Sequence, residues 1–179
     1  MITTQNKGTA MERINVRKSD PDLIEEVDSE EFLSGFRGCL ACGTCSAGCP
    51  VRRATTSYDP LRVIRMLILG LREELLKGDM IWLCSDCYTC QENCPMGIKL
   101  TDIINHLKNL AVKEENVPIG VSTQEKLLKD QGKIYVIDEF DNKKRSKAGL
   151  PLLPTMAEQA KLLLEKRKQQ PKGTERDSR

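Results

Sequence analysis

Apolar residues recur at helical spacing along two stretches in the middle of the chain. The first predicted helix starts at Asp59, which directly precedes a proline, and stops at Gly78. The second is capped by Thr101. The apolar faces consist of Leu61, Ile64, Ile68, Leu71 and Leu75 in the first helix and of Ile103, Ile104, Leu107, Leu110 and Ala111 in the second. This pattern predicts a mainly α fold whose core lies between helix faces.

Shorter helices are expected on either side of this region. Ahead of it, Asp28 or Ser29 is a predicted cap, and the apolar side of the helix would consist of Phe32, Leu33 and Phe36. After it, the capping-box pattern from Ser122 to Glu125 predicts a helix that runs to about Gln131.

The C-terminal part mixes signals that do not form a core of their own. Lys133 to Phe140 alternates like a strand, Lys143 to Gly149 is basic and is expected to be a solvated loop, and Leu150 to Pro154 is apolar. Thr155 with Glu158 predicts one more helix, carrying Leu162, Leu163 and Leu164. Because an isolated strand has no pairing partner in the chain, we expect an extended arm that docks on another protein.

Composition and charge narrow the function. The net charge of +2 comes from 28 basic and 26 acidic residues spread over 179 positions, so no basic field attracts nucleic acid. No apolar run is long enough to span a membrane, and the charged first thirty residues do not form a secretory signal, which predicts a cytoplasmic protein. Aromatic residues make up only 4% of the chain, so another feature must hold its middle together.

That feature is a pair of cysteine runs. The eight cysteines follow the pattern C-x2-C-x2-C-x3-C-P twice, at Cys39, Cys42, Cys45 and Cys49 and again at Cys84, Cys87, Cys90 and Cys94. In ferredoxins with this spacing, three thiolates bind one 4Fe-4S cluster and the fourth binds the other. We therefore predict two clusters, one held by Cys39, Cys42, Cys45 and Cys94, the other by Cys84, Cys87, Cys90 and Cys49.

Nearby residues fit this interpretation. Glycines would let the backbone pass close to inorganic sulfide, and Pro50 and Pro95 would turn the chain away after the last ligand; the glycines are Gly38, Gly43, Gly48 and Gly97. Disulfides belong to oxidising compartments, and zinc sites pair two CxxC units without the third thiol and the trailing Cys-Pro. Both alternatives therefore fit the sequence less well than 4Fe-4S clusters.

The predicted clusters favour electron transfer over catalysis. Four thiolates for each cluster leave no iron open to a substrate, and the sequence has neither a GxGxxG nor a P-loop pattern. His106, the single histidine, lies in a predicted helix and is given no role. We therefore expect a non-catalytic electron-transfer subunit of an oxidoreductase complex. The predicted segments are a flexible 1–27, an α-helical ferredoxin-like domain 28–115, a docking arm 116–170 and a disordered tail 171–179.

The sequence resembles the small iron–sulfur subunit of the heterodisulfide reductase of methanogenic archaea. The resemblance lies in CLACGTCSAGCPV at Cys39–Val51, YDPLRVIRMLILG at Tyr58–Gly70 and IWLCSDCYTCQENCPMGI at Ile81–Ile98. It covers about half of the chain strongly and the C-terminal extension weakly.

The resemblance implies a role in methanogenesis. It implies electron transfer from a flavin-containing iron–sulfur subunit to another subunit, whose CCG motifs bind the clusters that reduce the CoM-S-S-CoB heterodisulfide. It also implies flavin-based electron bifurcation, with a hydrogenase or formate dehydrogenase as a further candidate partner. The same double motif occurs in anaerobic glycerol-3-phosphate dehydrogenase, glycolate oxidase and fumarate reductase, so an electron-wire subunit of such an enzyme is the alternative. A nucleic-acid-binding redox sensor is disfavoured because the charge is dispersed.

Overall fold

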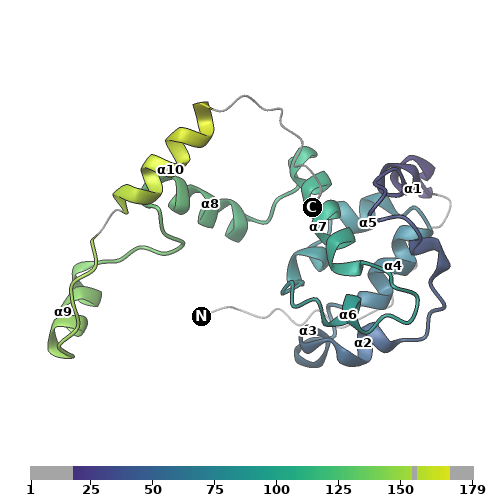
Figure 1. Cartoon of the computed structure of the whole chain (residues 1–179), viewed down its shortest axis with the longest axis horizontal. Helices are drawn as coiled ribbons and strands as arrows, with labels where there is room; N and C mark the ends of the chain where they lie inside the picture. The colour runs from purple at the N-terminus through teal and green to yellow at the C-terminus, as the bar shows by residue number, and fades with distance from the viewer. Residues whose placement is uncertain (1–17, 155–156, 170–179) are drawn as a thin grey trace. The chain divides into compact units, whose positions relative to one another are not determined.

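The computed structural model describes residues 18–154 and 157–169, and helices account for the regular structure in this part of the chain. The mainly α prediction is confirmed. The chain divides into two compact units, one ending at Asn116 and one starting at Val117, and each is described by itself (Figure 1). The predicted four segments do not follow this division at every point, and the tail 171–179 lies outside the described residues.

The first described helix, α1 (Pro21–Asp28), replaces part of the predicted flexible segment. Asp20 caps it by accepting a hydrogen bond from the backbone N–H of Asp22 at 3.0 Å, and Pro21 occupies the first turn, where its missing N–H costs nothing. Leu23 and Val27 are fully buried. The prediction that the segment through residue 27 is flexible is therefore wrong for residues 21–27, while residues 1–17 lie outside the described part.

Among the described helices, none begins at Asp28 or Ser29, because α1 ends there. The chain continues through turns into a short 3-10 helix, η2 (Phe36–Gly38). Of the predicted apolar side, Leu33 and Phe36 are buried, whereas Phe32 points to solvent with 55% of its surface exposed.

The long helix predicted from Asp59 to Gly78 is broken in two, α4 (Pro60–Ile68) and α5 (Arg72–Leu76). Asp59 caps α4 as predicted, accepting from the backbone N–H of Leu61 at 2.9 Å. The break falls at Gly70, whose φ of 63° is left-handed and whose carbonyl accepts from the N–H of Asp20 at 2.7 Å. Of the predicted apolar face, Ile64, Leu71 and Leu75 are buried in the core, whereas Leu61 and Ile68 are partly buried and pack against it.

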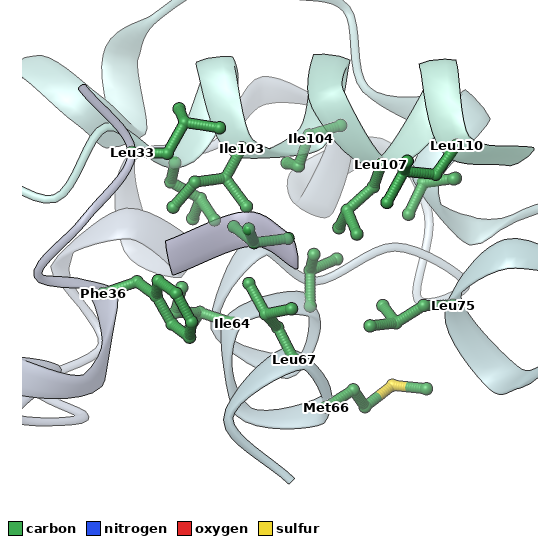
Figure 2. Packing of buried hydrophobic residues seen from close by; sticks show 14 of the residues in the cluster. Leu33, Phe36, Ile64, Met66, Leu67, Leu75, Ile103, Ile104, Leu107 and Leu110 are labelled. Carbon is green, nitrogen blue, oxygen red and sulfur yellow. The ribbon is translucent and has the colours of Figure 1, made fainter. Parts of the chain in front are cut away.

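The core of the first unit lies between α4, α5 and α7 (Leu100–Lys113). Figure 2 shows Ile103, Ile104, Leu107 and Leu110 on α7 facing Ile64 and Leu67 on α4. These side chains are aliphatic. Their burial stabilises the core, although the chain has few aromatic residues. Thr101 does not cap α7: Lys99 occupies that position, and Thr101 lies inside the helix with 1% of its surface exposed.

Arg72 ties the ends of three helices together at the edge of this core. Its guanidinium lies 3.6 Å from the Asp20 carboxylate, 3.2 Å from Glu26 and 2.7 Å from Glu114. Burial alone would lower the pKa of Arg72, but the hydrogen bonds to Glu114 and Glu26 raise it. Arg72 therefore stays charged, and its ion pairs connect α5 to α1 and to the end of α7.

The cysteine runs lie on short elements beside this core. They are α2 (Thr44–Gly48), α3 (Pro50–Ala54), the 3-10 helix η3 (Met80–Leu83) and α6 (Thr89–Glu92). α2 packs against α6, so the two runs, far apart in the sequence, lie side by side (Figure 1).

The second unit contains α8 (Ile119–Gln131), α9 (Glu139–Lys147) and α10 (Glu158–Gln169), with α8 packed against α10. The predicted helix to Gln131 is present, but it starts at Ile119 with Pro118 before it. The capping role predicted for Ser122 is therefore wrong: its hydroxyl donates to the Ile119 carbonyl at 3.0 Å within the helix.

The strand predicted over Lys133–Phe140 does not form, and the loop predicted over Lys143–Gly149 is largely helical. α9 spans most of that basic stretch, and a capping box between Asp138 and Asp141 starts it. The amide of Asn142 then exchanges two hydrogen bonds with the backbone of Leu153, at 2.9 and 3.0 Å. The Leu150–Pro154 segment is thus attached to α9.

Of the second predicted capping box, Thr155 lies outside the described residues, and Glu158 is the first residue of α10. Among the described helices, none has the length and apolar character that a membrane crossing requires.

Candidate iron–sulfur site

Four cysteines from both runs line one cavity of about 30 Å³. Cys39 follows η2, Cys42 precedes α2, Cys45 lies on α2, and Cys94 follows α6. Leu61, Met96 and Ile98 are among the apolar residues of the lining. We call this group of four cysteines site 1. The structure therefore brings cysteines of both runs to one place.

The other four cysteines form a second group, site 2: Cys49, Cys84, Cys87 and Cys90. Cys49 and Cys90 are buried in the core cluster, and Cys84 packs against it. Burial raises the pKa of the Cys90 thiol, and a hydrogen bond with Thr101 opposes this effect. Cys49 caps α3 with its sulfur, which accepts from the backbone N–H of Arg52 at 3.5 Å. Because α2, which carries Cys45, packs against α6, which carries Cys90, the two sites are neighbours.

Within the described residues, no three His, Cys, Asp or Glu side chains converge closely enough to bind a single metal ion. His106 lies on α7 and is absent from the lining of the site 1 cavity; its Nε2 is buried and makes no hydrogen bond in the described structure.

The loops between the cysteines use left-handed backbone at matching places in the two runs. Ala41 and Asp86 have φ of 53° and 52°, and Gly43 and Tyr88 have φ of 80° and 61°. Three of these four residues carry a side chain, for which left-handed backbone is strained. Both loops therefore contain backbone strain at equivalent positions. Of the predicted glycines, Gly43 and Gly97 have positive φ, whereas Gly38 and Gly48 do not.

The thiols of the two sites differ in exposure: two are exposed (Cys42 and Cys87), two are buried (Cys49 and Cys90) and the other four are intermediate. Hydrogen bonds from the side-chain hydroxyl and then the backbone N–H of Thr44 lower the pKa of Cys42, and Thr89 does the same for Cys87. By contrast, burial raises the pKa of the Cys84 thiol. Because iron binds thiolates, the lowered pKa of Cys42 and of Cys87 favours metal binding by these two side chains.

Two residues at site 2 were not predicted to have a functional role. The Thr101 hydroxyl lies 3.4 Å from the Cys90 sulfur. Tyr58, 1% exposed, has its pKa raised first by burial and then by a hydrogen bond to Cys84. Only weak sequence signals could have identified these two residues. Thr101 lies at a predicted helix cap, and Tyr58 directly precedes Asp59, which caps α4.

A small polar network connects α2, which carries Cys45 of site 1, to the neighbouring helices. The Ser46 hydroxyl donates to the Asp59 carboxylate, which also accepts from the Arg52 guanidinium at 3.3 Å and from backbone N–H groups of α4. Burial acts to raise the pKa of Asp59, but these hydrogen bonds outweigh it and lower the pKa. The charged Asp59 thereby joins α2, α3 and α4.

Comparison with known proteins identifies the family. A 4Fe-4S dicluster domain matches residues 35–98, which include both cysteine runs. The corresponding subunit of the ferredoxin:CoB–CoM heterodisulfide reductase of Methanosarcina mazei is 36% identical over 133 residues, which are 70% of this chain and 81% of that protein. The chain belongs to the family of heterodisulfide reductase iron–sulfur subunits. Membership agrees with the resemblance inferred from the cysteine runs and the segment between them.

Other members match different lengths of the chain. The iron–sulfur subunit of the CoB–CoM heterodisulfide reductase of Methanopyrus kandleri is 43% identical over 93 residues, 52% of this chain but only 48% of that protein. A protein of Archaeoglobus profundus, named for its likeness to this reductase subunit, is 27% identical over 148 residues, 82% of this chain and 75% of that protein. The chain thus spans about half the length of the relative with the higher identity.

Proposed function

We propose that the chain holds two 4Fe-4S clusters, one at site 1 and one at site 2, each bound by four thiolates. The observation that supports the proposal is the cavity lined by Cys39, Cys42, Cys45 and Cys94, which takes three cysteines from one run and one from the other. Sulfur donors in groups of four suit iron in cubane clusters, which when bound accept and release single electrons. With all four positions of each cluster bound by sulfur, the chain would relay charge and would not bind a reactant.

We further propose that the chain is the electron-transfer subunit of a heterodisulfide reductase complex. In this role it passes electrons between two other chains, one that contains flavin and one that carries CCG motifs and reduces CoM-S-S-CoB. Relatives named as subunits of such reductases support this role. Neighbouring sites suit it, because an electron has to step from one cluster to the next within one chain. The exposed apolar side chains of the second unit, beyond Asn116, suit an arm that docks on these partners.

The test is anaerobic purification of the native complex from the organism that makes the chain. We expect a flavoprotein and a protein with CCG motifs to co-purify with it, and the chain separated from these partners under anaerobic conditions to contain about eight irons. Recovery of zinc in place of iron would overturn the cluster assignment. Recovery of iron with partners of another enzyme type would overturn the reductase assignment alone.

A further inference from the structure

The third cysteine of each run has a different hydroxyl neighbour. At site 2, the buried Cys90 sulfur lies 3.4 Å from the hydroxyl of Thr101. At site 1, the nearest hydroxyl to Cys45 is that of Ser46, at 4.0 Å, and this hydroxyl already donates to Asp59. Thr101 has only one hydrogen, and the sulfur is the partner that the described contacts give it. The two sites therefore differ in a buried hydrogen bond.

The direction of this hydrogen bond is fixed once iron is bound. A metal-bound thiolate has no proton, so Thr101 must be the donor and Cys90 the acceptor. A buried hydroxyl without a partner is costly, which makes this contact stable in the closed core. Thr101 sits in the first turn of α7, whose apolar face is packed against α4, so the hydroxyl cannot easily turn away.

Tyr58 provides a second hydroxyl on the same site. It is 1% exposed and belongs to the buried cluster against which Cys84 packs, so another buried hydroxyl lies in the core beside site 2. Its position is fixed by the chain, because the next residue, Asp59, caps α4. Site 2 thus combines the two buried cysteines, Cys49 and Cys90, with two buried hydroxyl donors.

Burial and hydrogen bonding act on a cluster in opposite directions. Burial disfavours the extra negative charge of the reduced form, whereas an O–H donor to sulfur stabilises that charge. We propose that Thr101, with Tyr58 as a second donor, raises the reduction potential of the cluster at site 2. Neither residue is a ligand; both are positioning residues that act through a cysteine sulfur. The inference rests on the proposed function only in requiring that site 2 hold a cluster.

The test is a redox titration of the full-length holoprotein with dithionite and mediators, followed by electron paramagnetic resonance. Thr101→Val keeps the shape of the side chain and removes the hydroxyl. We expect it to reduce the equilibrium constant for one-electron reduction of one cluster about fivefold to tenfold, where tenfold is about 59 mV, and to leave the other cluster unchanged. Tyr58→Phe should shift the same cluster in the same direction.

Thr101→Ser is the matched control, because it keeps the hydroxyl and should keep the potential close to that of the wild type. Thr55→Val removes a hydroxyl whose described contact is with the Ser57 backbone and should shift neither potential. A wild-type potential in both Thr101→Val and Tyr58→Phe would overturn the inference, as would equal shifts of both clusters. If Thr101→Val does not fold, the potential measured for Tyr58→Phe tests the inference, with Thr101→Ser as the control. A wild-type protein without any cluster signal would instead overturn the proposed function.

Discussion

Cys94 is the last cysteine of the second run, yet its side chain lines the same cavity as Cys42 and Cys45 of the first run. The proposed crossed ligation makes a prediction about which cluster a single substitution removes. We expect Cys94→Ser to leave about four irons per chain, because one cluster loses a ligand while the other keeps all four of its own. Iron analysis and cluster spectra of the purified variant measure this directly.

Double variants identify the lost cluster. If Cys94 and Cys42 serve one cluster, the double variant Cys94→Ser with Cys42→Ser keeps about four irons. The matched combination of Cys94→Ser with Cys87→Ser should keep almost none, because both clusters lose a ligand. The reverse pattern would mean that each run binds its own cluster with all four of its cysteines.

The cysteine spacing predicts a set of ligands, but it does not predict the side chains around them. Spacing is a local property, and the pattern of eight thiols with two prolines is specific enough to indicate clusters from the sequence alone. The contact between Thr101 and Cys90 instead depends on how α7 packs beside α6, which no local pattern records. Tyr58 was missed for the same reason, since α4, α5 and η3 separate it in the sequence from Cys84, which packs against the same buried cluster.

At the scale of single elements, the break between α4 and α5 is the clearest departure from the periodic pattern. Gly70 has a φ of 63°, and a Cβ added there would lie 2.6 Å from the Asp20 carbonyl oxygen. We expect Gly70→Ala to destabilise the first unit by about 1–3 kcal/mol, because alanine is strained at this φ and meets backbone that cannot move aside. Chemical denaturation of the anaerobic holoprotein measures the change.

Gly120→Ala is the control for this prediction. Gly120 lies in α8, and a Cβ added there meets no atom within 4 Å, so alanine should be neutral or slightly stabilising. A Gly70→Ala variant as stable as the wild type would show that the loop between the helices relaxes freely.

The remaining differences at this scale come from capping. Asp138 starts α9 through a capping box completed by Asp141, an aspartate where glutamate or glutamine is the usual signal. Because this cap lacks the usual residue, the alternating pattern of Lys133–Phe140 predicted a strand, and the start of α9 was not recognised from the sequence. The basic residues Lys144, Arg145 and Lys147 then lie in the last turn, where positive charge is favourable to a helix.

At the scale of the whole molecule, the structure predicts which elements should unfold when iron is removed. The sequence predicts that the cluster domain loses much of its fold without iron, because few aromatic residues are available for a core. The structure has an aliphatic core between α4, α5 and α7, whereas the elements that carry the cysteines are short: α2 has 5 residues and α6 has 4. Helices of this length are not stable alone.

We therefore expect iron removal by a chelator to unfold the cysteine-bearing elements before the aliphatic core. Hydrogen–deuterium exchange followed by mass spectrometry should show fast exchange over 39–54 and 84–99 in the iron-free protein, with slower exchange retained in α4 and α7. The iron-loaded protein, handled identically, is the control. Equal loss of protection across α4 and α7 would mean that the clusters hold the entire first unit together.

The second unit should act through its apolar surface. Ile134, Tyr135, Phe140 and Leu152 each expose more than half of their surface, and burying such side chains against a partner contributes about 25 cal/mol for each Å² removed from water. We expect the double variant Tyr135→Ser with Phe140→Ser to weaken co-purification of the partner chains at least tenfold, because apolar aromatic side chains are common anchors of interfaces. Quantitative mass spectrometry of the anaerobically isolated complex measures the loss.

Two features of this experiment separate docking from folding. The replaced side chains are exposed, so iron content and helix content of the double variant should equal those of the wild type. Gln124→Ser, at an exposed polar position on α8 of the same unit, should retain the partners in full. Undiminished co-purification of the double variant, with its clusters intact, would exclude these aromatic side chains from the interface. The docking surface would then have to involve other exposed apolar residues, such as Leu162 and Leu163 on α10, or the first unit.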